Sequence, residues 1–112
     1  MNNALELEIN LLHERICSAL GDTTRIMIIL LLAEKPMYVN EITDALGAPQ
    51  STVSRHLRIL RERKLVKTTR EGTSIQYSLS DERIIQALDL MRSVLNQQIQ
   101  AEGKLTQVLT EK

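Results

Sequence analysis

The sequence contains no phenylalanine, no tryptophan and only two tyrosines, so its core must be built from leucine, isoleucine, valine and methionine. The single cysteine, Cys17, excludes a disulfide within the chain and is typical of a reducing compartment. The longest apolar run, residues 26–33, is far shorter than the ~20 residues that a membrane-spanning helix needs. No signal-peptide pattern opens the chain. We therefore expect a soluble, cytoplasmic protein that folds as one domain over residues 1–112 and does not enter a membrane.

The chain also lacks net charge, because its 14 Lys and Arg residues balance its 14 Asp and Glu residues. The charges are unevenly placed, however. Residues 49–73 carry seven Lys or Arg against two Glu, so this segment is strongly basic and the remainder is acidic. A continuous basic segment is typical of a nucleic-acid-binding face, although a merely solvated helix has the same composition.

Apolar residues at helical spacing predict two long helices at the start of the chain. The first covers residues 4–19 and carries an apolar stripe along one face. The second covers residues 23–34, is capped by Asp22 and is apolar nearly all round. Such a helix is buried on every side, so it is expected to form the centre of the core.

Two shorter helices follow. The third covers residues 40–46 with Asn40 as its cap, and the fourth runs from Pro49, at its first position, to Lys64. Gly47 ends the third helix, so only a short turn separates the two. The side chains expected to face the core are Ile42, Ala45 and Leu46 in the third helix and Val53, Leu57 and Leu60 in the fourth.

The apolar period then changes from 3.6 residues to two. Residues 65–79 alternate between apolar and polar side chains on both sides of Gly72, which predicts a β-hairpin. A last helix covers about residues 80–100, and the mostly polar residues after Gly103 are expected to fray. The predicted order is ααααββα, a mainly α fold with a small β-hairpin.

Residues 39–64 form a short helix, a tight turn and a second helix, which predicts a helix-turn-helix whose second member enters the major groove of DNA. The basic hairpin at residues 65–79 is then the wing of a winged helix-turn-helix. Amide and guanidinium groups suit base edges, hydroxyl groups bond either a base or a phosphate, and other Lys and Arg neutralise phosphates. The residues suited to base edges are Gln50, Arg55 and Arg58, those suited to either are Ser51 and Ser54, and those suited to phosphates are Arg63, Lys64, Lys67 and Arg70.

Three stretches, ALGDTTRIMIILLL, EITDALGAPQSTVSRHLRILRERKLV and REGTSIQYSL, together resemble the ArsR/SmtB family of winged-helix transcription regulators. The resemblance implies a homodimer, joined through its first and last helices, that represses by occupying an operator. The chain departs from the family pattern at Thr23, where the family usually has proline, and at Pro49, where it commonly has a capping serine. The groove-facing residues that the resemblance implies are Gln50, Ser51, Thr52, Ser54, Arg55 and His56.

Two apolar stripes favour dimerisation on their own. The stripes in residues 1–20 and 80–100 both repeat at spacings of four, three and four, the pattern expected where helices pair. The alternative is that both stripes cover the core of their own subunit. A two-fold dimer predicts a near-palindromic double-stranded operator with half-sites about 10 bp, or a multiple, apart. The stripes consist of Leu5, Ile9, Leu12 and Ile16 and of Ile84, Leu88, Met91 and Leu95.

The metal ligands found in sensing members of such a family are missing from the sequence. There is no cysteine cluster at the start of the third helix and no histidine in the last, so we expect no metal site and no cofactor. His13 and Cys17 lie four residues apart and are the remaining candidates for a sensor, through a metal, a metalloid or thiol oxidation. A cysteine that only packs in an interface is the alternative.

The sequence shows no Ser–His–acid set, Gly-rich phosphate loop or catalytic carboxylate pair, so we expect a binding protein and not an enzyme. The favoured hypothesis is a sequence-specific, dimeric DNA-binding repressor that lacks the usual metal-sensing sites. Two alternatives stay open. One is a winged-helix module that binds an acidic protein partner, and the other is a thiol- or metalloid-responsive repressor that senses through Cys17.

Overall fold

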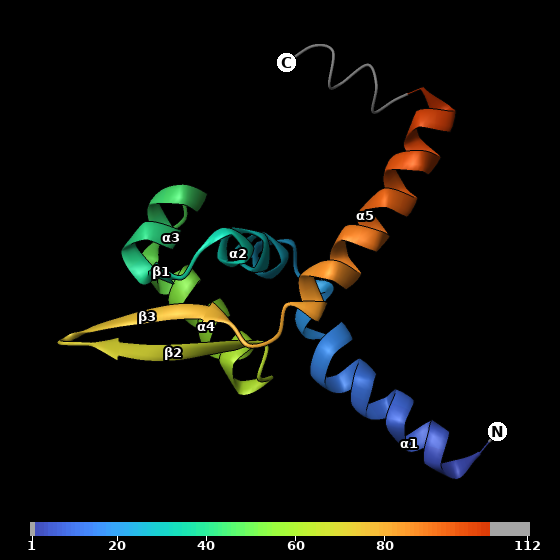
Figure 1. Cartoon of the computed structure of the whole chain (residues 1–112), viewed down its shortest axis with the longest axis horizontal. Coiled ribbons are helices and arrows are strands. Elements are labelled where there is room, and N and C mark those ends of the chain that lie inside the picture. Colours follow the sequence, from blue (N-terminus) through green and yellow to red (C-terminus); the bar gives the residue numbers. More distant parts are fainter. Residues whose placement is uncertain (1, 104–112) are drawn as a thin grey trace. The chain divides into compact units, whose positions relative to one another are not determined.

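The structure, a computed structural model, describes residues 2–103. The chain divides between Glu82 and Arg83 into two compact units, a larger N-terminal one and one formed by the last helix. The segment after Gly103, expected to fray, lies outside the described residues. The helical elements of the first unit, shown in Figure 1, are α1 (Asn3–Leu12), a π turn (His13–Cys17), a 3₁₀ turn (Ala19–Gly21), α2 (Thr23–Glu34), α3 (Val39–Leu46) and α4 (Gln50–Glu62).

Helix α2 contributes Ile28, Ile29 and Leu32 to the core of the first unit, as its composition predicts, but it is not buried on every side, because Met27 exposes 47% of its surface. Asp22 caps it, because the carboxylate oxygen Oδ1 accepts hydrogen bonds from the backbone N–H of Thr24 (2.8 Å) and of Arg25 (3.3 Å). Its bounds and its cap are confirmed. The aliphatic core of the unit consists of Ala19, Ile28, Ile29, Leu32, Met37, Ile42, Val53, Leu57, Leu60, Leu65 and Val66.

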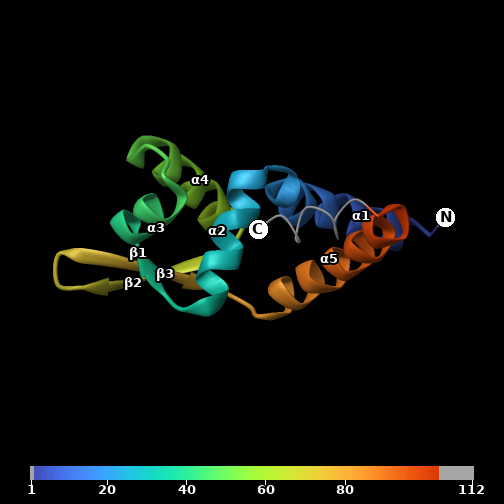
Figure 2. The same cartoon turned by 90° about the horizontal axis from the view of Figure 1, so that it is seen from above.

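The first helix differs from the prediction, because regular α-helix ends at Leu12. The backbone N–H of Ser18 donates to the carbonyl of His13 (2.8 Å), five residues back, so one extra residue is accommodated in a π turn. No residue of α1 is buried. Figures 1 and 2 both show α1 extending away from the other helices of its unit.

The boundaries of α3 and α4 also differ from the prediction. Helix α3 begins one residue before Asn40, because the carboxylate of Glu41 reaches back and accepts from the backbone N–H of Tyr38 (2.9 Å). Ala45 is exposed, whereas Ile42 is buried and Leu46 half-buried, so the inward face of this short helix is narrower than predicted. Pro49 precedes α4 as its cap residue, with extended backbone, and does not form its first turn.

Helix α4 ends at Glu62, two residues earlier than predicted. The reason is that Lys64 adopts a left-handed conformation (φ 65°), the only described residue other than glycine to do so. The N–H of Leu65 then donates back to the carbonyl of Leu60 (2.9 Å), which closes the helix and directs the chain into the sheet.

The sheet has three antiparallel strands in the order β1-β3-β2. The hairpin of β2 (Val66–Glu71) and β3 (Ser74–Leu79) is confirmed, with Gly72 at φ 65° in its turn. The strand β1 (Met37–Tyr38) was not predicted and pairs with β3 through Met37 and Tyr77. Figure 2 shows α3 and α4 beside the sheet, with the tip of the hairpin extending beyond them.

The second unit is the helix α5, Arg83–Glu102. Most of its residues are exposed. Within residues 2–103, neither this helix nor any other combines the length and the apolar character needed to cross a membrane.

Candidate nucleic-acid interface

Helices α3 and α4 form a helix-turn-helix. Gly47 ends α3 in a left-handed conformation (φ 65°), and its N–H donates to the carbonyl of Thr43 (2.9 Å). A side chain with a β-carbon is strained at this φ, so glycine permits the abrupt change of direction. Only Ala48 and Pro49 then separate the turn from α4, which fixes the two helices closely together.

The two faces of α4 differ sharply in burial. Val53, Leu57 and Leu60 have no exposed surface, as predicted, and hold the helix against the core. The opposite face is fully available to a partner. Its exposed residues include five of the expected DNA contacts, Gln50, Ser51, Ser54, Arg55 and Arg58, while Thr52 is half-buried.

His56 is a correction to the predicted set. It was expected to face the groove, but it is buried, with 5% of its surface exposed. It lies three residues after Val53 and four before Leu60, so it belongs to the inward stripe of α4. Its Nδ1 lies 3.1 Å from Nη1 of Arg25 and its Nε2 lies 4.0 Å from Oδ1 of Asp22. His56 therefore points toward the start of α2 and does not lie on the exposed face of α4.

The hairpin of β2 and β3 presents two exposed basic side chains, Lys67 and Arg70. Successive residues of a strand point to opposite faces, so these two side chains, three residues apart, project from opposite faces of the hairpin. Lys67 pairs in register with Ser78, in the body of the sheet, whereas Arg70 pairs with Ile75 beside the turn. If the tip of the wing enters a DNA groove, Arg70 can contact the phosphates along one edge of that groove. Lys67 can then contact phosphates outside the groove.

A concave surface of about 450 Å³ lies where the start of α4, the start of α3 and the wing come together. Gln50 is one of its lining residues and was predicted as a DNA contact. Asn40, Thr73 and Ser74 also line it and were missed, because they are brought together only by the folding of the hairpin over α3. Uncharged donors in such a recess suit the sugar–phosphate backbone.

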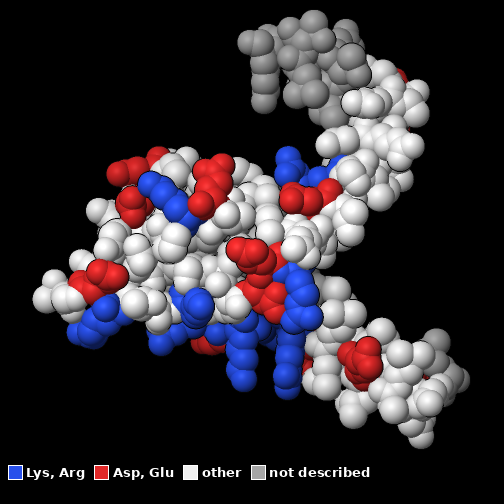
Figure 3. Space-filling view, in the orientation of Figure 1, with Lys and Arg blue, Asp and Glu red and all other residues white. Residues whose placement is uncertain are grey.

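The charges of the first unit are unevenly distributed. Figure 3 shows most of the visible Lys and Arg along the lower edge of this view, where some Asp and Glu lie beside them, and a second group of Asp and Glu on the upper side. Among the described residues, the side chains of Arg55, Arg58 and Lys67 make no hydrogen bond or ion pair. Their charges are therefore available to a polyanion.

The apolar stripe of α1 is exposed over most of its length. Leu5, Ile9 and Leu12 each expose more than two fifths of their surface, and Ile16, in the π turn, is half-buried. In α5, Leu88 is buried and Ile84 half-buried, whereas Met91 and Leu95 are exposed.

The two candidate sensor residues, His13 and Cys17, lie at the ends of the π turn and are both exposed. Cys17 is a free thiol. Within the part of the chain that the structure describes, no three His, Cys, Asp or Glu side chains gather in a way that would hold a metal ion. A sensing function at His13 and Cys17 stays a prediction.

A helix-turn-helix followed by a basic two-stranded wing defines the class of winged helix-turn-helix proteins. The sequence model of the bacterial regulatory protein, arsR family, matches residues 22–68. Relatives named as helix-turn-helix transcriptional regulators are also similar over most of their own length. MJ1325 of Methanocaldococcus jannaschii is 44% identical over 77 residues, which are 68% of this chain and 86% of that protein. The chain belongs to the ArsR family.

Further comparisons agree with this membership. KmtR of Mycobacterium tuberculosis is 43% identical over 67 residues, which are 60% of this chain but 52% of KmtR, so the match spans about half of that regulator. Among solved structures, NolR of Sinorhizobium fredii superposes with a TM-score of 0.76 at 26% identity, covering 84% of this chain and 93% of NolR. The homodimeric winged helix-turn-helix DNA-binding domain of Mb0332 from Mycobacterium bovis gives 0.79 at 26% identity, covering 90% and 93%.

Proposed function

We propose that this protein is a homodimeric, sequence-specific DNA-binding repressor that acts in the cytoplasm and catalyses no reaction. The observation that carries the proposal is the division of α4 into a fully buried aliphatic face and a polar, basic face beside the wing. This exposed face is the part of a winged helix-turn-helix that enters the major groove. Family membership adds the class of regulators to which the proposal assigns it.

The exposed residues divide the work of DNA recognition between them. Arg55 and Arg58 can each donate two hydrogen bonds to a guanine edge, and Gln50 can pair with adenine. Lys67 and Arg70 neutralise phosphates beside the groove and so add affinity without reading sequence. Gln50 also lines the recess next to the wing, so the backbone of the bound strand would pass between α4 and the hairpin.

The dimer is proposed from the unburied apolar stripes. Leu5, Ile9 and Leu12 form an exposed apolar surface on α1, and Met91 and Leu95 form a second one on α5. Exposed apolar surface of this extent marks an interaction site. A second copy of the chain is the partner we propose, because the repeat at four, three and four residues suits helix pairing and the similar domain of Mb0332 is homodimeric. Such a dimer would bind a near-palindromic operator.

Salt dependence distinguishes DNA binding from binding of an acidic protein at the same basic face. The test uses a duplex that the protein selects from a random-sequence pool. We expect its affinity to fall by about tenfold or more between ~50 and ~200 mM salt, because bound phosphates release counterions. Failure to select any sequence, together with capture of an acidic protein, would favour the alternative of a protein-binding module.

Arg55→Ala is expected to weaken binding to the selected duplex by about 1–3 kcal/mol and to relax base preference at one position of each half-site. Lys67→Ala serves as the matched variant, since it also removes one exposed positive charge but from the wing. Its affinity should fall by the same factor on the selected and on random duplexes. Competition binding on both duplexes checks the pair, and identical behaviour of the two variants would contradict the assignment.

A further inference from the structure

His56 lies in the recognition helix α4 but is buried, so it cannot contact DNA and needs another explanation. Its ring nitrogen Nδ1 lies 3.1 Å from Nη1 of Arg25. A guanidinium is always protonated and can only donate, so Nδ1 must accept and the imidazole must be neutral, with its proton on Nε2. The Nε2 proton then faces the carboxylate of Asp22 at 4.0 Å. His56 is thus held between an anion and a cation at the start of α2.

Arg25 also binds the backbone between α1 and α2. Its Nε donates to the carbonyl of Ala19 (2.6 Å) and its Nη2 to the carbonyl of Ser18 (3.3 Å). All three nitrogens of the guanidinium are therefore used, one toward α4 and two toward the backbone between α1 and α2. Ala19 is itself buried, so this backbone is a fixed point of the unit.

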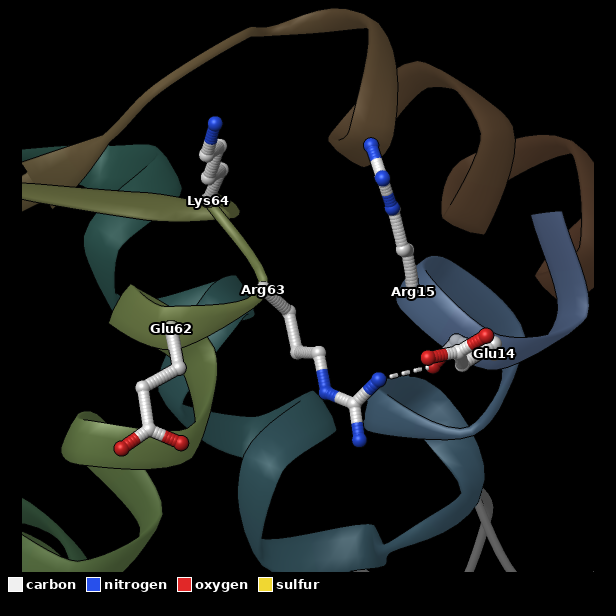
Figure 4. Close-up of a pocket in the computed structure, with 5 residues that line it drawn as sticks. All are labelled: Glu14, Arg15, Glu62, Arg63 and Lys64. Atoms are coloured by element: carbon white, nitrogen blue, oxygen red, sulfur yellow. Dashed lines mark hydrogen bonds between the residues drawn. The ribbon is translucent and has the colours of Figure 1, made fainter. Parts of the chain in front are cut away.

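The far end of α4 is tied to the same segment. Figure 4 shows Arg63 reaching across a cavity of about 420 Å³, and its Nη1 donates to the backbone carbonyl of Glu14 in the π turn. Arg15 and Lys64, on opposite walls of this cavity, do not cross it in Figure 4. The recognition helix is therefore fixed at two points, through His56 and through Arg63, to residues 14–19, which continue directly from α1.

We propose that His56 is a positioning residue. In its neutral form it holds the recognition helix α4, through Arg25, against residues 14–19, which continue from the proposed dimerisation helix α1; we call this set of contacts the lock. Protonation of His56 breaks the lock and frees α4. The inference rests on the proposed function, because the lock matters only if two recognition helices must match two half-sites. The distance between half-sites is fixed on the DNA. Freedom of α4 relative to α1 would spread the two helices over many spacings and lower affinity.

Protonation opposes the observed geometry directly. An imidazolium carries a proton on Nδ1, which would then point at a guanidinium N–H that cannot accept it. The charged groups around His56 are Asp22 and Arg25 from the start of α2 and Arg55 from α4. Burial lowers the pKa of His56, Asp22 raises it, and the two arginines lower it, with a net shift below its ordinary value. The folded state therefore binds this proton less readily than the unfolded chain, and the lock weakens as the pH falls below about 6.5.

A simple charge argument predicts tighter DNA binding in acid, the opposite of what the lock predicts, so the pH dependence of DNA affinity distinguishes the two. Protonation adds a positive charge to a DNA-binding helix and would by itself strengthen binding to a polyanion. The positioning function predicts weaker binding in acid. The chain contains only two histidines, His56 and the exposed His13, so the other one supplies a matched control.

Affinity for the selected duplex is measured at pH 7.5 and pH 5.5 at constant ionic strength, for the unaltered protein, His56→Gln and His13→Gln. We expect the unaltered protein and His13→Gln to bind the duplex more weakly at pH 5.5 than at pH 7.5, by more than about threefold, because protonation of His56 removes the acceptor for Arg25. His56→Gln keeps a neutral acceptor for Arg25 and should bind within about threefold of the unaltered protein at pH 7.5, with little loss at pH 5.5. Unchanged or tighter binding of the unaltered protein at pH 5.5 would overturn the proposal.

A second measurement needs no DNA and so separates this inference from the proposed function. Native-state amide hydrogen exchange, corrected for intrinsic rates, is followed in the unaltered protein at both pH values. We expect the amides of α4 and of residues 14–19 to lose protection together at pH 5.5, while those of β2 and β3 keep theirs. Protection that is equal at both pH values refutes the lock. Loss of protection in a protein that selects no DNA would support the lock and refute the repressor.

Discussion

Leu57→Ala is expected to lower the free energy of unfolding by about 2–5 kcal/mol, the range for removing a fully buried leucine side chain. Leu57 has no exposed surface and lies between Val53 and Leu60 on the face of α4 that packs into the core. The chain has no phenylalanine or tryptophan whose bulk could fill the resulting space. Domains of this size have a total stability of about 5–15 kcal/mol, so much of it would be lost.

Urea unfolding followed by circular dichroism measures this loss. All samples need the same protein concentration, because dimerisation makes apparent stability depend on it. Arg58→Ala is the control, since Arg58 lies on the same helix, one residue further, and is exposed. Its unfolding free energy should stay within about 0.5 kcal/mol of the unaltered protein. Comparable losses in the two variants would mean that the burial of α4 has been misassigned.

Ile9→Glu is expected to convert the proposed dimer to a monomer and to reduce affinity for the selected duplex by about 100-fold or more. Ile9 lies at the middle of the exposed stripe of α1, with 45% of its surface accessible. A carboxylate there would lose its hydration on association without gaining a partner. A monomer offers one recognition helix and loses the gain that comes from engaging two half-sites together, about 10²–10⁴ in affinity.

Leu7→Glu is the matched control for Ile9→Glu. Leu7 is also an exposed apolar residue of α1, but it lies roughly half a turn around the helix axis from the stripe of Leu5, Ile9 and Leu12. It should leave both dimerisation and operator binding nearly unchanged. Analytical ultracentrifugation and a gel-shift assay report the two properties separately. A dimeric Ile9→Glu, or a monomeric Leu7→Glu, would show that another face of α1 forms the interface.

The helix-turn-helix and the wing were predictable because their signals are local. Asp22 marks the start of α2, Gly47 marks the turn, and strict alternation marks the hairpin. The burial of His56 also had a local signal, since its spacing from Val53 and Leu60 places it on the apolar stripe. The resemblance to the family, which implies a groove-facing position for His56, outweighed that spacing in the prediction. Its partners, Arg25 and Asp22, lie more than 30 residues away and could not be found from spacing alone.

Two features depended on contacts that the sequence does not display. The π turn at His13–Cys17 adds one residue to a helical turn, and five residues are too few to reveal a change of period. Its consequence is that Ile16 no longer continues the exposed stripe and becomes half-buried. The strand β1 has two residues, Met37 and Tyr38, and forms because both pair with β3. The amino-acid composition of so short a segment does not indicate a strand. The missed lining residues, Asn40, Thr73 and Ser74, depend on the same docking.

The strand order β1-β3-β2 leaves β2 at the border of the sheet. Unpaired backbone groups along such a border invite a strand from a neighbouring molecule, and successive additions lead to aggregates. The border strand here carries Lys67 and Arg70, so two wings that approach side by side repel each other. The cations that we propose to contact DNA thus also keep concentrated molecules of this protein from joining their sheets. Neutralising both is expected to weaken DNA binding and to increase the tendency to aggregate.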